Sequence, residues 1–280
     1  MSLLAIGHPA GRALTAALRQ VARRRSVILC YHGVADTPHD EDPYRLQLSP
    51  ATFRTQLEML RDAGFRFVTV ARLAGAAADG PPPPGLAAIS FDDGLRNNLT
   101  TALPILRQLG IRATVYVPTG WLGGRHPDIG AAADAAILTG EEVRELAQEG
   151  WEIGAHTISH ADLSLLDYAQ CRAEVERSCA ELAQVTGTPV QTLAYPLGRY
   201  SEAAIAAARD CGLLAAVAGE SKSWRPYELA RTMVGGADSR SVFLLKLTDR
   251  YEPLSASAPV RALQICKKAA RRRIFAAETV

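Results

Sequence analysis

Two short polar motifs stand out because their residue types can hold a metal ion and move a proton. Asp92 and Asp93 directly follow the apolar run 86–91. Two adjacent carboxylates repel each other unless a cation lies between them or one of them is protonated. His156 and His160 are four residues apart, and this spacing puts both on one face if the segment turns helically. Together the motifs offer two nitrogen ligands, one oxygen ligand and a spare carboxylate, as in a hydrolytic metal site.

Each motif also has an ordinary interpretation. Asp93 with Gly94 is a common turn dipeptide, in which the carboxylate is simply solvated. The H-x-x-x-H spacing of His156 and His160 also arises by chance. The choice therefore depends on where the predicted fold brings these residues.

Short apolar runs typical of buried strands alternate with helical patterns, which have apolar residues at i, i+3 and i+4. The predicted strands are Val27–Tyr31, Phe65–Val70, Leu86–Phe91, Ala113–Val117, Trp151–Ala155, Leu193–Tyr195 and Leu213–Val217. The predicted helices are Thr52–Ala63, Leu99–Leu109, Thr139–Gln148, Tyr168–Thr186 and Ser201–Cys211. Glycines follow these helices where C-caps belong, at Gly64, Gly110, Gly150, Gly187 and Gly212.

This alternation predicts an α/β fold with a parallel sheet and right-handed crossovers, and it favours one barrel over two domains. In such folds the chemistry lies at the carboxyl ends of the strands. Asp92, His156 and also His32 each follow a predicted strand directly. Their shared position favours the interpretation as a site.

Composition narrows the function classes. The chain has 280 residues, of which 48% are hydrophobic and 21% charged, so it can bury a core. A net charge of +2 argues against a nucleic-acid partner. The five cysteines show no C-x-x-C spacing, which argues against a disulfide framework or a thiolate zinc site. Unpaired cysteines and the absence of a secretory pattern favour the cytoplasm.

Both ends of the chain are basic. Residues 1–25 have the pattern of a basic amphipathic arm, and residues 251–280 form a basic tail that contains Lys267–Arg273. Such charge runs are solvated faces in most proteins, and they also suit an anionic membrane surface, here the inner face of the membrane. The tetraproline Pro81–Pro84 is a stiff connector within the central region, residues 26–250.

The motifs resemble those of a known family. The run Ile89-Ser90-Phe91-Asp92-Asp93-Gly94 is similar to the TFDDG motif of polysaccharide deacetylases, the NodB-homology family or carbohydrate esterase family 4. His156-Thr157-Ile158-Ser159-His160 is similar to the family motif H-[ST]-x-x-H, and Glu152–Ala155 before it also fits. Thr114–Pro118 matches the strand after the first helix of the family, and Leu193–Gly198 resembles its third motif, written around R-x-P-Y.

The resemblance covers residues 26–250 and implies a distorted (β/α)7 barrel as a single catalytic domain. It implies metal-dependent removal of acetyl groups from the N-acetylated sugars of a polysaccharide or its precursor. Asp93, His156 and His160 are then the metal ligands, and Asp92 is the general base that takes a proton from water.

The third motif supplies the oxyanion and substrate side of the site. By resemblance, this role falls to Tyr195, Pro196 and Leu197, with a backbone N–H at Leu197 holding the developing negative charge. Trp121 follows the predicted strand Ala113–Val117, and it either stacks on a sugar ring or simply packs.

The sequence departs from the family pattern in two places. Ala194 stands where the third motif has an arginine that orients the base; Arg231 is the best substitute and Arg199 the second, unless both are surface arginines. No histidine follows His160, although the family usually has a late histidine as its acid.

The first predicted strand offers a replacement for that acid. It ends in Cys30-Tyr31-His32-Gly33-Val34, which resembles the Y-H-x-[IV] start of circularly permuted members, including biofilm poly-N-acetylglucosamine deacetylases. In those members the early histidine is the acid. The resemblance therefore implies this role for His32, with a histidine packed at the barrel rim as the alternative.

Other functions stay open at this level. The same site could hydrolyse a non-sugar amide or an O-acetyl ester, or the chain could be a carbohydrate-binding relative with weakened catalysis. Two histidines and one aspartate suit Zn²⁺ best, and they also accept Co²⁺, Ni²⁺ or Fe²⁺. The three remaining histidines, His8, His39 and His126, lie in proline-flanked segments and are predicted at the surface.

Overall fold

The computed structural model describes residues 9–38, 40–129, 135–219 and 223–248 of the chain. The chain divides into two compact units, Met1–Asp238 and Ser239–Val280. Every strand of the described residues belongs to the first unit. In the second unit, the described residues form α8 (Arg240–Lys246), which Ser239 caps by accepting a hydrogen bond from the backbone N–H of Val242. The predicted basic tail, residues 251–280, lies outside the described residues.

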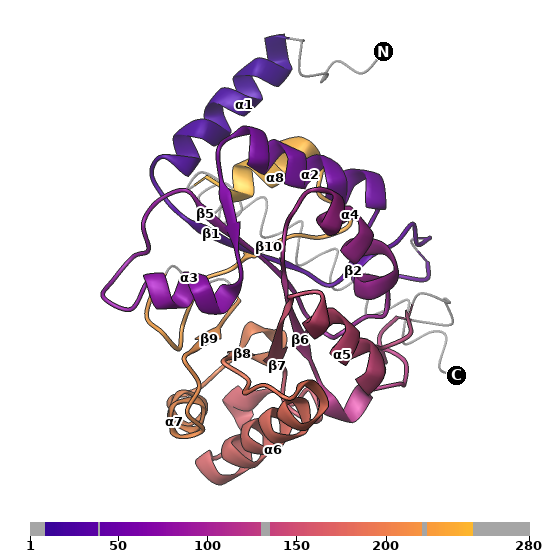
Figure 1. Cartoon of the computed structure of the whole chain (residues 1–280), viewed down its shortest axis with the longest axis vertical. Helices are drawn as coiled ribbons and strands as arrows, with labels where there is room; N and C mark the ends of the chain where they lie inside the picture. Colours follow the sequence, from indigo (N-terminus) through magenta and orange to yellow (C-terminus); the bar gives the residue numbers. More distant parts are fainter. Residues whose placement is uncertain (1–8, 39, 130–134, 220–222, 249–280) are drawn as a thin grey trace, which may run out of the picture. The chain divides into compact units, whose positions relative to one another are not determined.

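Short parallel strands form the framework of the first unit (Figure 1). They are β1 (Val27–Tyr31), β4 (Arg66–Val68), β5 (Leu86–Phe91), β6 (Thr114–Val117), β7 (Glu152–Ala155), β8 (Thr192–Ala194), β9 (Ala215–Val217) and β10 (Thr232–Met233). In space they follow the order β10-β1-β5-β6-β7-β8-β9, and β4 also pairs with β5. A separate parallel pair joins β2 (Gly33–Val34) to β3 (Gln47–Leu48).

The sheet is a distorted half-barrel in which β4 and β6 both pair with the same edge of β5. β1 pairs with residues 87–91 of β5, while β4 pairs with residues 86–88 and β6 with residues 90–91. Since β5 and β7 are parallel and close in the order, their carboxyl ends lie on the same edge of the sheet. The expected (β/α)7 architecture of the NodB type is confirmed.

Helices connect the strands and cover the sheet. They are α1 (Pro9–Ala22), α2 (Pro50–Asp62), α3 (Val70–Ala76), the π-helix η1 (Asn98–Ala102), α4 (Leu103–Gln108), α5 (Gly140–Gln148), α6 (Tyr168–Thr186) and α7 (Glu202–Asp210), with single 3₁₀ turns η2 (Thr119–Trp121), η4 (Leu163–Leu165) and η5 (Pro196–Gly198). Capping boxes begin α5 at Thr139 and α6 at Asp167. No helix among the described residues is long and apolar enough to cross a membrane.

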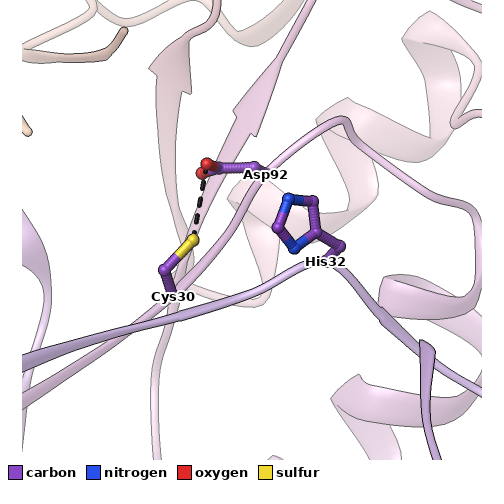
Figure 2. Close-up of side chains that lie close together, drawn as sticks. All are labelled: Cys30, His32 and Asp92. Atoms are coloured by element: carbon purple, nitrogen blue, oxygen red, sulfur yellow. Dashed lines mark hydrogen bonds between the residues drawn. The ribbon is translucent and has the colours of Figure 1, made fainter. Parts of the chain in front are cut away.

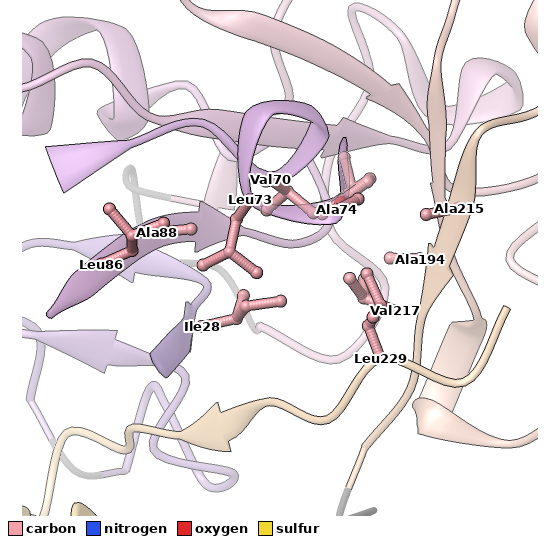
Figure 3. Packing of buried hydrophobic residues seen from close by; sticks show 11 residues of the cluster. Ile28, Val70, Leu73, Ala74, Leu86, Ala88, Ala194, Ala215, Val217 and Leu229 are labelled. Atoms are coloured by element: carbon pink, nitrogen blue, oxygen red, sulfur yellow. The ribbon is translucent and has the colours of Figure 1, made fainter. Parts of the chain in front are cut away.

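Buried apolar side chains form a core cluster inside the half-barrel (Figure 3). The buried side chains of this cluster come from β1, α3 and β5 on one side and from β6, β8, β9 and Leu229 on the other. A second group consists of aromatic rings in contact, Tyr31, Phe53, Phe91 and Trp151, with neighbouring centroids 5.2 to 5.8 Å apart. Burial of this much apolar surface fixes the strands, so their carboxyl ends form a rigid support for the site.

The seven predicted strands and four of the five predicted helices are present, with shifts of a few residues at their ends. The five glycines predicted as C-caps all have left-handed φ angles, between 66° and 93°. Leu99–Leu109 is not one helix, because the π-helix η1 precedes α4. The sequence did not indicate β10, which is two residues long, nor the short pair β2 and β3.

Candidate active site

The acidic pair lies where the central strand β5 ends. The backbone N–H of Asp92 donates to the carbonyl of Tyr31 at 2.9 Å, so the pair begins level with the end of β1. Asp93 has a φ of 67° and Gly94 a φ of 64°, both in the left-handed region. A non-glycine residue held there stores backbone strain of the kind found at functional sites. After this turn the two carboxylates contact different sets of side chains.

The histidine pair follows β7 in a loop and not on a helix. The spacing of His156 and His160 suggested one helical face, but Thr157 and His160 have φ angles of 66° and 59°, which an α-helix does not allow. The two rings nevertheless lie with their centroids 4.9 Å apart. His156 Nδ1 lies 2.7 Å from the carbonyl oxygen of Ala194 and donates to it, which leaves the lone pair of Nε2 for the site.

Asp93, His156 and His160 form a group that fits a divalent cation. One ligand atom from each lies within 4.8 Å of the other two. Oδ1 of Asp93 is 3.4 Å from His156 Nε2 and 3.3 Å from His160 Nε2. This oxygen is buried and has no hydrogen-bond partner among the described residues, a costly state for a carboxylate. Two nitrogens and one oxygen with room for further ligands suit Zn²⁺ and similar cations.

Asp92 is held by a buried arginine. Nη1 and Nη2 of Arg231 donate to its two carboxylate oxygens at 2.6 and 2.7 Å, a bidentate pair. Arg231 Nε donates to the carbonyl of Ala218 at 3.1 Å, which fixes the plane of the guanidinium group. Arg199 instead pairs with Asp162 at 2.9 Å and is largely exposed. Arg231, which directly precedes β10, therefore lies where the missing third-motif arginine would act.

The surroundings of Asp92 keep it ionised. Burial, the largest single influence, raises its pKa, but the charge and hydrogen bonds of Arg231 together with the nearby His156 and His32 lower it by more in sum, so the pKa lies below its ordinary value. Cys30 Sγ also donates to Asp92 Oδ2 at 3.4 Å, as Figure 2 shows. Cys30, His32 and Asp92 lie together like a second set of ligands. Because the Arg231 fork occupies both oxygens of Asp92, this set does not suit a cation.

His32 follows β1, and its ring lies close to Asp92 (Figure 2). Its Nε2 lies 3.9 Å from Asp93 Oδ2, and its side chain is 15% exposed. Its carbonyl oxygen accepts a hydrogen bond from the side-chain amide of Asn98 at 2.8 Å, which holds the segment in place. Burial lowers the pKa of His32, and the nearby carboxylates of Asp93 and Asp92 only partly offset this. The imidazole is thus close to both carboxylates and still accessible.

The segment predicted on the oxyanion side follows β8. Tyr195 is fully buried, and its hydroxyl donates to the carbonyl of Tyr227 at 3.1 Å. Pro196 is buried as well, so neither side chain is open to a ligand. Leu197 has a φ of 58° and is 62% exposed. In this segment only Leu197 is open to a ligand.

Trp121 packs against two histidines. Its ring centroid lies 4.8 Å from that of His160 and 5.2 Å from that of His126. His126 was predicted at the surface, but it is 4% exposed and its Nε2 lies 2.9 Å from Asp93 Oδ2. Sequence reasoning missed it because it lies well after β6, in a proline-flanked loop with no strand-end position. His8 and His39 lie outside the described residues.

Fold and site together define an α/β half-barrel hydrolase with an acidic pair and a histidine pair at the carboxyl edge of the sheet. The sequence model of the polysaccharide deacetylase family matches residues 79–216. The Bacillus subtilis (strain 168) polysaccharide deacetylase-like protein YxkH is 28% identical over 221 residues, which cover 77% of this chain and 74% of that protein. The Staphylococcus aureus (strain MRSA252) poly-β-1,6-N-acetyl-D-glucosamine N-deacetylase is 23% identical, over 73% of this chain and 72% of that protein.

Solved structures agree with this similarity. The Streptococcus pyogenes deacetylase PplD, in complex with acetate, has a TM-score of 0.68 and 25% identity, covering 80% of this chain and 98% of that one. IcaB from Ammonifex degensii has a TM-score of 0.68 over 80% of this chain and 97% of its own, at 24% identity. Residues 79–216 of this chain therefore belong to the polysaccharide deacetylase family, of the NodB-homology type.

Proposed function

We propose that this protein is a metal-dependent deacetylase that removes acetyl groups from N-acetylated sugars of a polysaccharide or its precursor. The observation that carries the proposal is the contrast between two adjacent carboxylates. Asp93 presents to the nitrogens of His156 and His160 a buried oxygen that has no hydrogen-bond partner within the described ranges. Asp92 is kept ionised by Arg231 next to them. A cation site beside an ionised base is one arrangement that can hydrolyse an unactivated amide.

A divalent cation, most simply Zn²⁺ and otherwise Co²⁺, Ni²⁺ or Fe²⁺, would be held by Asp93, His156 and His160. When bound it supplies Lewis acidity, which lowers the pKa of water and polarises a carbonyl group. Its charge also compensates the buried carboxylate of Asp93.

The chain's own residues supply the proton transfers. Asp92 accepts the proton of the attacking water, with its orientation fixed by the Arg231 fork. The backbone N–H of Leu197 donates to the acetyl oxygen as negative charge develops there. His32 donates a proton to the sugar nitrogen as the C–N bond breaks, because an amine leaves poorly without one. Trp121, at the rim beside His160, offers an apolar face to the sugar ring.

The substrate class follows from the relatives and needs a direct test. The named staphylococcal relatives act on poly-β-1,6-N-acetyl-D-glucosamine, so we expect acetate release from β-1,6-linked N-acetylglucosamine oligomers, with β-1,4-linked chito-oligosaccharides as the second substrate. The protein is stripped with a chelator, assayed, and assayed again after Zn²⁺ is restored. Release that depends on the restored metal supports the proposal. Release from acetylxylan alone would favour an O-acetyl esterase, and no release from any of these would contradict the proposal and leave a non-sugar amide substrate or a binding role.

Contact with an anionic membrane surface through the basic residues at the chain ends stays a prediction. Co-sedimentation with phosphatidylglycerol vesicles at low and high salt tests it, because binding driven by charge is lost at high salt.

A further inference from the structure

Asp93 is contacted from two sides, and the two sides differ. The His156 and His160 nitrogens lie near Oδ1, which has no hydrogen-bond partner among the described residues. On the other side, His126 Nε2 lies 2.9 Å from Oδ2, within hydrogen-bond distance. His126 is not part of the three-residue group that fits a cation. The Asp93 carboxylate thus presents Oδ1 to the cation site, while His126 contacts Oδ2.

The hydrogen bonds of His126 assign its proton. The backbone N–H of Asp128 donates to His126 Nδ1 at 3.1 Å, so Nδ1 is the acceptor nitrogen. In a neutral imidazole the other nitrogen then carries the hydrogen. His126 Nε2–H therefore donates to Asp93 Oδ2, and this nitrogen has no lone pair left to bind a cation.

The loop that carries His126 is fastened to the chain just after Asp93. The backbone N–H of Leu138, at the end of this loop, donates to the carbonyl of Gly94 at 2.9 Å. Within the loop, the backbone N–H of His126 donates to the carbonyl of Ala135 at 2.8 Å. A small apolar cluster of Leu95, Ile129, Ala135 and Ile137 packs the loop against the segment after Asp93. The donor and the carboxylate are thus parts of one locally rigid unit.

We infer that His126 is a positioning residue that orients the Asp93 carboxylate for the cation by donating Nε2–H to Oδ2. A single carboxylate ligand can rotate and exchange its two oxygens, which spreads its position and weakens coordination. A fixed donor on Oδ2 stops this exchange and leaves Oδ1 facing His156 and His160. Residues of this kind form hydrogen bonds to the metal ligands and not to the metal itself, and their removal typically lowers metal affinity by about 10- to 100-fold. The inference rests on the proposed function, since it assumes that Asp93 is a ligand.

Two substitutions of nearly equal size separate the donor from the bulk of the side chain. His126→Leu fills a similar volume without a donor, and His126→Gln places an amide N–H₂ group in reach of Oδ2. We expect His126→Leu to bind Co²⁺ about 10- to 100-fold more weakly than the wild type, and His126→Gln to restore most of the affinity. Affinity is measured by competition with a chromogenic chelator. The d–d spectrum of the bound Co²⁺ is recorded for each variant, and it should keep the wild-type bands because the ligands are unchanged.

The outcomes separate this inference from the proposed function. If the wild type does not bind Co²⁺ at all, the proposed metal site is wrong. If the wild type binds and His126→Leu binds equally tightly, only the role of His126 is wrong. If both variants lose Co²⁺ affinity equally and the d–d bands change, His126 is itself a ligand. If both lose Co²⁺ affinity equally and the bands stay unchanged, His126 contributes only through packing. Either result overturns the inference.

A measurement on the unaltered protein covers the case in which His126→Leu does not fold. Long-range ¹H–¹⁵N correlation spectra of the imidazoles distinguish the two neutral tautomers, with His126→Gln used to assign the signal. We expect His126 as the Nε2–H tautomer in both the metal-free and the Co²⁺- or Zn²⁺-treated protein. An Nδ1–H tautomer in either state would contradict the inference.

Discussion

At the scale of single residues, Asp92 and Asp93 show how surroundings divide work between two identical side chains. Asp92 accepts a bidentate pair from Arg231 and a thiol hydrogen bond from Cys30. In the described part of the chain, the side chains that pair with Asp93 are imidazoles, and one of its buried oxygens has no hydrogen-bond partner there. Different environments of two neighbouring carboxylates are the usual sign of different roles in catalysis. Here they separate a base from a ligand.

The first prediction concerns the Arg231 fork. Arg231→Ala leaves Asp92 buried without its countercharge, so we expect the free energy of unfolding at pH 7 to fall by about 3–5 kcal/mol. Arg199→Ala is the matched control, because Arg199 forms an exposed pair with Asp162 and should cost less than about 1 kcal/mol. Urea denaturation measures both.

The pH dependence of this effect has a definite sign. In the wild type the pKa of Asp92 lies below its ordinary 3.8, so the pair stabilises above that value and its contribution is lost as the pH falls through the lowered pKa. Without Arg231, burial raises the pKa of Asp92, and the variant should gain stability as the pH falls from 7 toward 5. A variant that loses stability over that range would contradict this account of the pair.

The second prediction concerns His32. If it protonates the leaving amine, His32→Ala should lower kcat/KM on an N-acetylated sugar by about 10²–10⁴-fold. The same variant should retain most of its activity on nitrophenyl acetate, whose leaving group needs no proton. Steady-state kinetics on both substrates with matched metal content measure this. Equal losses on the two would assign His32 to packing at the barrel rim.

At the scale of elements, close packing between strands supports the arginine that holds the base. A Cβ added to Gly154 in β7 would lie 2.3 Å from the ring of Tyr116 in β6. Tyr116 is fully buried, and the Arg231 guanidinium lies 5.7 Å from the centroid of its ring. Because Gly154 has no side chain, the ring of Tyr116 can occupy this space, next to the guanidinium group of Arg231.

The third prediction tests this contact. Gly154→Ala should destabilise the protein by about 1–3 kcal/mol, because the buried ring has no room to move away. Gly75→Ala is the control: Gly75 lies in α3 with nothing within 4 Å of the added Cβ, so we expect a gain of up to about 1 kcal/mol. Thermal denaturation measures the stability of both variants. A Gly154→Ala variant as stable as the wild type would contradict the prediction and show that the sheet adjusts to the added methyl group.

The elements were predictable where local sequence determines them. Apolar runs such as Leu86–Phe91 and the glycines that end helices have local causes, namely burial and left-handed φ angles. The link between Arg231 and Asp92 depends on β10, which is too short for a pattern and pairs only through β1. His126 reaches Asp93 through a long loop, and nothing in its neighbours Arg125 and Pro127 indicates this. Non-local contacts of this kind come from the tertiary fold alone.

At the scale of the whole molecule, the half-barrel gathers residues from distant parts of the chain at one edge. His32 comes from the end of β1, Asp92 and Asp93 from β5, His156 and His160 from the end of β7, and Arg231 from the start of β10. The structural similarity to PplD and IcaB extends over 80% of this chain in each case.

The most direct test of this account separates cation binding from proton transfer in one variant. Asp92→Asn should keep the fold and a full complement of Zn²⁺ by elemental analysis, because Asp92 is not a ligand, with Asp93→Ala as the control that loses the metal. Acetate release by Asp92→Asn from N-acetylglucosamine oligomers should then fall by about 10²–10⁴-fold, the usual contribution of a general base. A metal-loaded, folded Asp92→Asn variant with wild-type turnover would contradict the account.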